Sequence, residues 1–204
     1  MSTNQKALVS SGGGTAGGAW MLGIIDALHS ADVDLGDADL IVGTSAGARV
    51  GAVLATGALD HALGLYRRSD HPRLETRVPL DAFVAAAMRI MSEFPDRQEA
   101  AKRIANLEPL GSTLVTAEDR QCMVAAQLPV QTWPEKRVAI TAVDTQSGLR
   151  VVFDANSGVA LLDAASASGA LPGIFPLVTI DGKRYADSPA GVRIAELSWF
   201  LGPD

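Results

Sequence analysis

The sequence predicts an α/β fold, because strand-like and helix-like segments alternate around two glycine-rich turns. Residues 7–10 and 40–42 are short apolar runs of the kind that buried strands show. Residues 11–18 and 43–47 follow them as turns rich in glycine, and each turn leads into an apolar segment typical of a helix. Two strands that end in such turns are expected to lie side by side and to bring the turns together.

The second turn carries the pattern Gly43-x-Ser45-x-Gly47. Glycines on both sides of a serine relieve crowding where the backbone bends sharply, so that the hydroxyl stands above the sheet. The helix that follows is expected to end at Gly57, and its N-terminus favours developing negative charge. We interpret Ser45 as a nucleophile, with close packing in the turn as the alternative. Arg49, one turn into this helix, is interpreted as a packing or ion-pairing residue.

The first turn has the spacing G-x-G-x-x-G, and its helix is expected over residues 19–28. A dinucleotide-binding loop shares this spacing but needs an acidic residue at the end of the next strand, where this chain has none. A Walker A loop is excluded because no lysine follows the glycines. We interpret the loop as an oxyanion hole, in which the amides of Gly13 and Gly14 face the same point as the Ser45 hydroxyl. The glycines of the spacing are Gly12, Gly14 and Gly17.

Length and composition restrict the class of protein. A chain of 204 residues predicts one domain over residues 1–204, and a net charge of −6 without a basic cluster argues against nucleic acid as a partner. A single cysteine, Cys122, interpreted as a structural thiol, and a polar N-terminus predict a cytoplasmic protein. No apolar run approaches the roughly 20 residues that cross a bilayer. The hydrophobic fraction of 48% leaves open a lipid-like substrate, peripheral contact with a membrane surface, or an apolar partner.

A serine nucleophile needs a base, and no histidine occupies the late position that the usual Ser-Asp-His order requires. The three histidines, His29, His61 and His71, all lie in the first half of the chain. They are expected to be solvated or to cap helices, with His61 or His71 in a rearranged triad as the alternative. The base is therefore sought among the carboxylates.

Three aspartates are candidates for this base. Asp144 and Asp154 fall in turn contexts that need no functional explanation. Asp187 ends the second strand of a hairpin whose turn is Asp181-Gly182. Taken alone, Asp187 would be interpreted as a helix N-cap.

Three ordered motifs make the sequence resemble the patatin-like phospholipases, most densely over residues 7–57 and 138–187. The motifs are Gly12-Gly13-Gly14-Thr15-Ala16-Gly17-Gly18, Gly43-Thr44-Ser45-Ala46-Gly47, and Ala170-Leu171-Pro172-Gly173-Ile174-Phe175-Pro176 leading to Asp187. The resemblance implies a three-layer α/β sandwich with a mainly parallel central sheet. It also implies hydrolysis of lipid acyl esters, of the phospholipase A, lysophospholipase or esterase type, by a dyad of Ser45 as nucleophile and Asp187 as base.

In this interpretation the oxyanion donors are the amides of Gly13, Gly14 and Ala46, and neither a cofactor nor a metal is needed. Two features depart from the family pattern. Ser188-Pro189 follows the aspartate where the family commonly has glycine, and the chain stops at Asp204, which is short for the family. These departures predict an exposed sheet edge that favours self-association as a homo-oligomer, or loss of activity. The alternatives are an acyltransferase and a non-catalytic lipid-binding or interaction protein.

Residues 58–137 form the segment with the weakest motifs and are expected to be a helical or cap region. Within them, residues 81–94 predict an amphipathic helix with Asp81 as N-cap and Pro95 as the stop. Its apolar stripe is interpreted as core, or as the lining of an acyl-chain channel. The stripe consists of Phe83, Ala87, Ile90, Met91 and Phe94.

Overall fold

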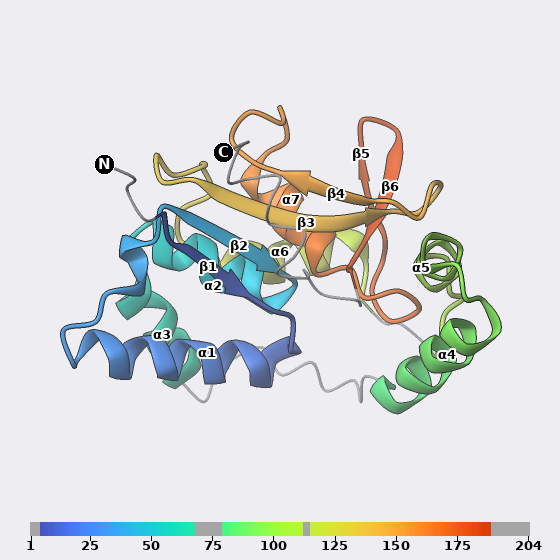
Figure 1. Cartoon of the computed structure of the whole chain (residues 1–204), viewed down its shortest axis with the longest axis horizontal. Coiled ribbons are helices and arrows are strands. Elements are labelled where there is room, and N and C mark those ends of the chain that lie inside the picture. Colours follow the sequence, from blue (N-terminus) through green and yellow to red (C-terminus); the bar gives the residue numbers. More distant parts are fainter. Residues whose placement is uncertain (1–4, 68–78, 112–114, 189–204) are drawn as a thin grey trace.

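The computed structural model describes residues 5–67, 79–111 and 115–188, in which a six-stranded mixed sheet is covered by helices (Figure 1). The strands are β1 (Ala7–Ser10), β2 (Leu40–Thr44), β3 (Val138–Asp144), β4 (Arg150–Phe153), β5 (Val178–Ile180) and β6 (Lys183–Ala186). β1, β2 and β3 are parallel neighbours, whereas β4 and β6 pair antiparallel with β3, and β5 pairs antiparallel with β6. The predicted α/β class with a mainly parallel central sheet is confirmed, and antiparallel strands extend it beyond β3.

Two of the parallel strands, β2 and β3, are buried, in keeping with sequences that are apolar without alternation. All five residues of β2 are buried, and β3 is buried over its first six residues. Strands that are covered on both faces need apolar side chains in both directions, which explains the continuous runs seen in the sequence. Thr44 and Thr141, the polar exceptions, satisfy one another through a hydrogen bond of 2.7 Å between their hydroxyls.

Seven helices surround the sheet in the described part of the chain. They are α1 (Gly14–His29), α2 (Ala46–Ala55), α3 (Leu59–Arg67), α4 (Leu80–Glu93), α5 (Arg97–Ala105), α6 (Ala117–Ala126) and α7 (Leu161–Ser168). On β3, Ala142 packs with residues of α2, α6 and α7, while the next residue, Val143, packs with Ala105 of α5. Successive side chains of a strand point to opposite faces, so helices cover both faces of the sheet in three layers, as predicted. α1 and α3 pack in turn against α2 (Figure 1).

The helix boundaries differ from the predicted ones at two N-termini. α1 begins at Gly14, five residues earlier than expected, although glycine is a poor helix former. The early turns are held by close approach: a Cβ on Gly18 would lie 2.8 Å from the Tyr66 hydroxyl. α4 begins at Leu80, so that Asp81 lies in its first turn and is not the N-cap. In the first turn, the negative charge of Asp81 still interacts favourably with the positive end of the helix dipole.

Two surface positions correct expectations about the core. The apolar stripe of α4 is only partly core, because Phe83, Ala87 and Ile90 are buried against α5 whereas Met91 is 61% exposed. Cys122 is exposed on α6, so it does not pack as a structural thiol in the interior. The segment 58–137, expected to be helical or a cap, contains α3, α4, α5 and α6 in its described residues.

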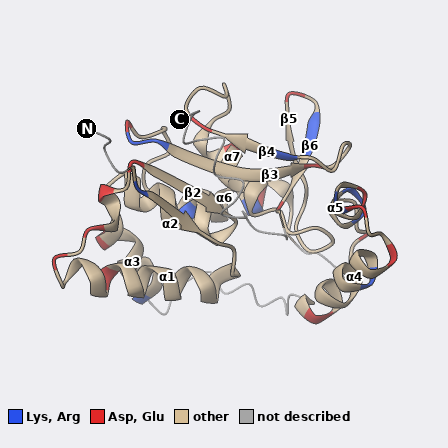
Figure 2. Cartoon of the chain, viewed as in Figure 1, with Lys and Arg blue, Asp and Glu red and all other residues tan. Residues whose placement is uncertain are grey.

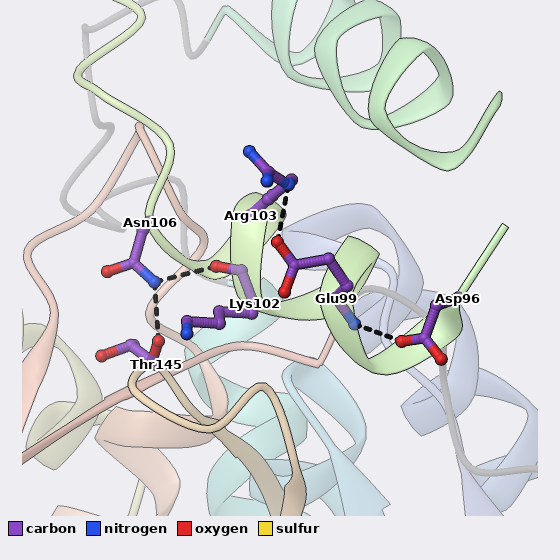
Figure 3. A network of polar contacts seen from close by, with 6 residues as sticks. All are labelled: Asp96, Glu99, Lys102, Arg103, Asn106 and Thr145. Atoms are coloured by element: carbon purple, nitrogen blue, oxygen red, sulfur yellow. Dashed lines mark hydrogen bonds and ion pairs between the residues drawn. The ribbon is translucent and has the colours of Figure 1, made fainter. Parts of the chain in front are cut away.

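A polar network ties α5 to the turn that follows β3 (Figure 3). Asp96 caps the helix by accepting a hydrogen bond of 2.7 Å from the Glu99 amide, and Glu99 forms an ion pair of 2.8 Å with Arg103. Asn106 donates a hydrogen bond of 2.7 Å to the carbonyl of Thr145. The outer helix layer is thereby fixed to the carboxyl end of β3.

Candidate active site

Two strands reach the same edge of β3 from opposite directions, and their ends bring Ser45 and Asp187 together. β2 pairs parallel with β3 as far as Thr44, and β6 pairs antiparallel with it as far as Ala186. β4 occupies the other edge of β3 over the same stretch. The ends of β2 and β6 therefore face one another across one position of β3, since their last partners there are Thr141 and Val143. The residue that follows each strand is Ser45 or Asp187.

The turn between β2 and α2 has the sharp bend that its glycines predict. Ser45 has a positive φ of 56°, which an L-residue adopts only under strain. A Cβ on Gly43 would lie 2.5 Å from the Ala48 Cα, and a Cβ on Gly47 would lie 2.1 Å from the Ser10 carbonyl oxygen. Only glycine fits these two positions, and the half-buried Ser45 stands between them at the start of α2.

The last residue of α7 and the segment that follows it bind the backbone amides of both residues. The Ser45 amide donates a hydrogen bond of 2.7 Å to the Ser168 hydroxyl, and the Asp187 amide donates one of 2.9 Å to the Ala170 carbonyl. These bonds hold the backbones of both residues to the same short segment, although Ser45 and Asp187 are far apart in sequence.

The Asp187 carboxylate is buried, with 6% of the residue exposed, and burial raises its pKa to about 6. Four interactions oppose this effect and lower the pKa of the carboxyl: a hydrogen bond from the Ser45 side chain, the charge of Arg49, the Ser188 amide and the charge of Arg120. Burial dominates, so the carboxyl titrates near neutrality. A carboxylate that accepts a hydrogen bond from a serine hydroxyl and titrates there can remove the proton of that hydroxyl.

The glycine loop lies against the serine. A Cβ on Gly12 would lie 3.3 Å from the Ser45 Cβ and 3.9 Å from its Oγ. Gly13 precedes the first residue of α1, Gly14, and Ala46 is the first residue of α2. Amides in the first turn of a helix have no acceptor within the helix, so two helix N-termini offer donors beside one hydroxyl. This arrangement suits a negative charge that develops on a substrate oxygen.

The histidines do not take part in this arrangement in the described part of the chain. His29 lies in the last turn of α1 and His61 in α3, and both are exposed. Neither is among the groups that shift the pKa of Asp187. His71 lies outside the described residues.

The other two candidate carboxylates, Asp144 and Asp154, accept hydrogen bonds that stabilise turns. Asp144 accepts hydrogen bonds from the amides of Ser147 and Gln146, at 3.0 and 2.8 Å, and the Ser147 bond is the main cause that lowers the pKa of Asp144. Asp154 accepts one from the Asn156 amide at 2.9 Å. Both aspartates therefore have the turn role that their sequence context indicates.

A surface pocket of about 610 Å³ lies at the end of β3 beside α5 and the turn between β5 and β6. None of the predicted site residues lines it. Basic residues (Lys102, Lys183 and Arg184) and acidic residues (Glu99 and Asp144) line it together, and Figure 2 shows charges of both signs on α5 and basic residues on β6. We therefore define the candidate site by the contacts of Ser45 and Asp187 and not by this pocket.

Sequence reasoning missed two residues of the site. Ser168 binds the Ser45 amide, and Arg120 is buried near Asp187. Neither belongs to a spacing pattern that involves Ser45. Ser168 lies two residues before the Ala170–Pro176 motif, which was the one available signal. Arg49, interpreted as a packing or ion-pairing residue, is buried within reach of the Asp187 charge.

The predictions about the C-terminal residues can be compared with the structure only as far as Ser188. Ser188 is buried and its amide bonds the Asp187 carboxylate, whereas residues 189–204, on which the expected exposed sheet edge depends, lie outside the described residues. Within the described ranges, no group of three or more His, Cys, Asp or Glu residues is placed to hold a metal ion. In those same ranges, no helix combines the length and the apolar character needed to cross a membrane.

Comparison with protein families decides where this arrangement belongs. The model of the family described as patatin-like phospholipase matches residues 8–188, which include the glycine loop, Ser45 and Asp187. The chain belongs to the patatin-like phospholipase family. The resemblance carried by the three motifs is thereby confirmed.

Solved structures similar to this patatin-like chain are larger proteins. The crystal structure of VipD from Legionella pneumophila matches with a TM-score of 0.52 and 16% identity, over 93% of this chain and 47% of VipD. The type III effector protein ExoU matches with a TM-score of 0.44 and 24% identity, over 83% of this chain and 41% of ExoU. The patatin-like chain spans less than half the length of either, and the likeness to VipD shows a shared fold. No curated protein matches the chain.

Proposed function

We propose that this patatin-like chain hydrolyses acyl esters of lipids, with Ser45 as the nucleophile and Asp187 as the base. The observation that carries the proposal is the hydrogen bond from the Ser45 side chain to a buried carboxylate whose pKa is about 6. A general base works best when its pKa lies near the working pH. Membership of the patatin-like phospholipase family supports a lipid ester as the substrate class.

In the first half of the reaction, the Ser45 Oγ attacks the acyl carbonyl while its proton passes to Asp187. A bond forms between Oγ and the carbonyl carbon, and the electron pair of the C=O bond moves to the oxygen. When this oxyanion collapses, the alcohol leaves with the proton from Asp187, and an acyl-enzyme remains. Water then attacks the acyl carbon and gives a proton to Asp187. When the second oxyanion collapses, the bond between the acyl carbon and Ser45 Oγ breaks, Oγ takes the proton back from Asp187, and the carboxylic acid leaves.

The oxyanion would be stabilised by amides of Gly13, Gly14 and Ala46. An aspartate is a weak base, so these donors are expected to supply much of the acceleration. The loss of one oxyanion donor typically costs on the order of 10²–10³ in rate. The helix N-termini that begin beside Ser45 support this assignment.

The test of the nucleophile is covalent labelling with a fluorophosphonate probe. We expect one label on the folded protein, located at Ser45 by mass spectrometry of a digest, and no label in Ser45→Ala. Asp187→Asn should label about 10²–10⁴-fold more slowly, since the probe also requires a deprotonated serine. Ser92→Ala, an exposed serine on α4, is the matched control and should label as the parent does.

The outcomes separate the alternatives. Full labelling speed in Asp187→Asn would show an active serine with another base. No label on protein whose circular dichroism shows a folded state would contradict the proposal and favour a non-catalytic lipid-binding role. An ester product formed from added alcohol, in place of free acid, would indicate an acyltransferase.

We also propose that α4 brings the chain to a lipid surface. One side of α4 is exposed and apolar although its other side is buried, and the exposed residues are Leu80, Val84, Met88 and Met91. The buried side packs against Ile174, in the segment that begins directly after Ala170. Contact of this helix with lipid would place the bilayer on the side of α4 that faces away from Ile174, with α4 between the lipid and the segment that follows Ala170.

Partition into phosphatidylcholine vesicles tests this contact. The double variant Met88→Ser, Met91→Ser should lower the partition coefficient by about tenfold or more, because one fully buried methionine contributes roughly 1.5–3 kcal/mol. Leu149→Ser, which changes an exposed leucine in the turn after β3, is the matched control and should leave partition unchanged. Equal partition of all three proteins would contradict a role for α4.

A further inference from the structure

Two arginines are buried near Asp187 on different helices. Arg49 comes from α2, one turn after Ser45, and Arg120 comes from α6, and each is only 8% exposed. Burial lowers the pKa of both guanidinium groups, that of Arg120 to about 10, and the charge of Asp187 acts in the opposite direction on each. A buried guanidinium is costly unless an anion and hydrogen bonds compensate it.

Both guanidinium groups converge on Gly169. A Cβ on Gly169 would lie 2.9 Å from Arg49 Nη1 and 3.2 Å from Arg120 Nη2, and Arg120 Nη2 donates a hydrogen bond of 3.2 Å to the Gly169 carbonyl. The Arg120 guanidinium also lies over the Phe175 ring, 4.1 Å from its centroid. Gly169 is thus a position where a side chain would displace the arginines.

Gly169 lies between the two residues that anchor the site. Ser168 accepts the hydrogen bond from the Ser45 amide, and Ala170 accepts the one from the Asp187 amide. Three consecutive residues therefore hold the serine, the two arginines and the aspartate in one arrangement. If each arginine only filled space in the core, the two guanidinium groups would not need to meet at Gly169.

We propose that Arg49 and Arg120 are positioning residues, which meet at Gly169 between the two residues that bind the Ser45 and Asp187 amides and there favour the ionised form of the Asp187 carboxyl. The inference rests on the proposed function, because it assigns the arginines a role through the base of that reaction. Opposite charges within about 4–6 Å favour the charged form of a carboxyl, which burial alone would leave protonated. The aspartate in turn stabilises two cations that otherwise repel one another, as the effect of Arg49 in lowering the pKa of Arg120 indicates.

The charged groups around the cluster come from three helices. Among the described residues, Arg49 of α2 and Arg120 of α6 are the charges that act on Asp187. Burial raises the pKa of the Tyr66 hydroxyl on α3, and the nearby charge of Arg49 opposes part of this rise. Two guanidinium nitrogens, Arg49 Nη1 and Arg120 Nε, have no hydrogen-bond partner in the described part of the chain. Tyr66 and then Asp187 oppose the effect of burial on the pKa of Arg49, and Asp187 opposes it on the pKa of Arg120, so the carboxylate compensates both arginines.

The test measures the pKa of Asp187 without using catalysis. The pH dependence of unfolding free energy, compared between each protein and its Asp187→Asn counterpart, reports this pKa through linkage. Arg120→Gln should raise the pKa of Asp187 above about 6, since it removes one of the two cations that lower it. Arg120→Lys should restore most of the shift because it keeps the charge. Gly169→Ala, which displaces both guanidinium groups without removing either, should raise the pKa as well.

The matched control is Arg89→Gln, an exposed arginine on α4, which should leave the pKa of Asp187 unchanged. In the hydrolysis assay, the acid limb of kcat/KM should move by the same amount in Arg120→Gln. An unchanged pKa of Asp187 in folded Arg120→Gln and folded Gly169→Ala would overturn the inference. The two failures can be told apart. If Arg120→Gln raises the pKa of Asp187 but the parent protein neither labels nor hydrolyses esters, the electrostatic role is supported and the proposed function is refuted.

Discussion

Asp187→Asn is expected to slow hydrolysis by about 10²–10⁴ and, at the same time, to stabilise the folded chain by about 3 kcal/mol at pH 8. The carboxyl titrates at about 6 in the folded chain against an ordinary value of 3.8, so the folded state binds its proton more tightly than the unfolded state does. The resulting contribution to stability is complete below about pH 4 and is lost as the pH rises through 6. An amide carries no charge at any pH and avoids this loss.

The measurement is urea unfolding of the parent and of Asp187→Asn at pH 4 and pH 8. The difference in unfolding free energy should be small at pH 4 and about 3 kcal/mol in favour of the variant at pH 8. The pKa of about 6 already includes the charges of Arg49 and Arg120, which lower it. The expected difference of about 3 kcal/mol in unfolding free energy therefore already accounts for the attraction that both arginines lose in Asp187→Asn. Hydrolysis should fall by about 10²–10⁴, the usual contribution of a general base.

Asp181→Asn is the matched control, because Asp181 is exposed in the turn between β5 and β6 at a positive φ of 49°, which asparagine tolerates. It should change stability little at either pH. A destabilised Asp187→Asn at pH 8, or a difference that does not vary with pH, would show that the buried carboxylate stabilises the fold and would contradict this prediction.

Gly47→Ala is expected to destabilise the fold by about 3 kcal/mol or more, because the added methyl group meets backbone and not a flexible side chain. It would lie 2.1 Å from the Ser10 carbonyl oxygen and 2.4 Å from its carbon. Relief requires α2 to move away from the end of β1, which would also displace Ser45 from the glycine loop. Thermal unfolding and fluorophosphonate labelling of the same sample measure both effects.

The matched control for this substitution is Gly23→Ala. Gly23 lies in the exposed interior of α1 and has nothing within 4 Å of an added Cβ, so alanine should stabilise the helix by up to about 1 kcal/mol. The two variants make the same chemical change with opposite expected signs. A Gly47→Ala protein as stable as the parent would show that the approach of β1 to α2 is looser than the structure has it.

The features that the sequence predicted correctly are those that depend on neighbouring residues. The apolar runs of β1 and β2, the hairpin at Asp181-Gly182 and the bend at Ser45 follow from local propensity and from glycine at positions that no other residue fits. The predictions failed where packing outweighs propensity. α1 starts within the glycine loop because Gly13 and Gly18 allow close approach, and the short helix α7 was not predicted at all.

The sequence by itself determined the strand, turn and helix around Ser45 and, through the family resemblance, named Asp187 as its partner. Only the tertiary structure decided that β2 and β6 end against one another on the same edge of β3, because strand register depends on pairing between distant segments. It also decided the burial that raises the pKa of Asp187 to about 6, and the approach of Arg49 and Arg120 that opposes it. Charge effects of this kind depend on distance and solvent exposure, and neither can be derived from residue order.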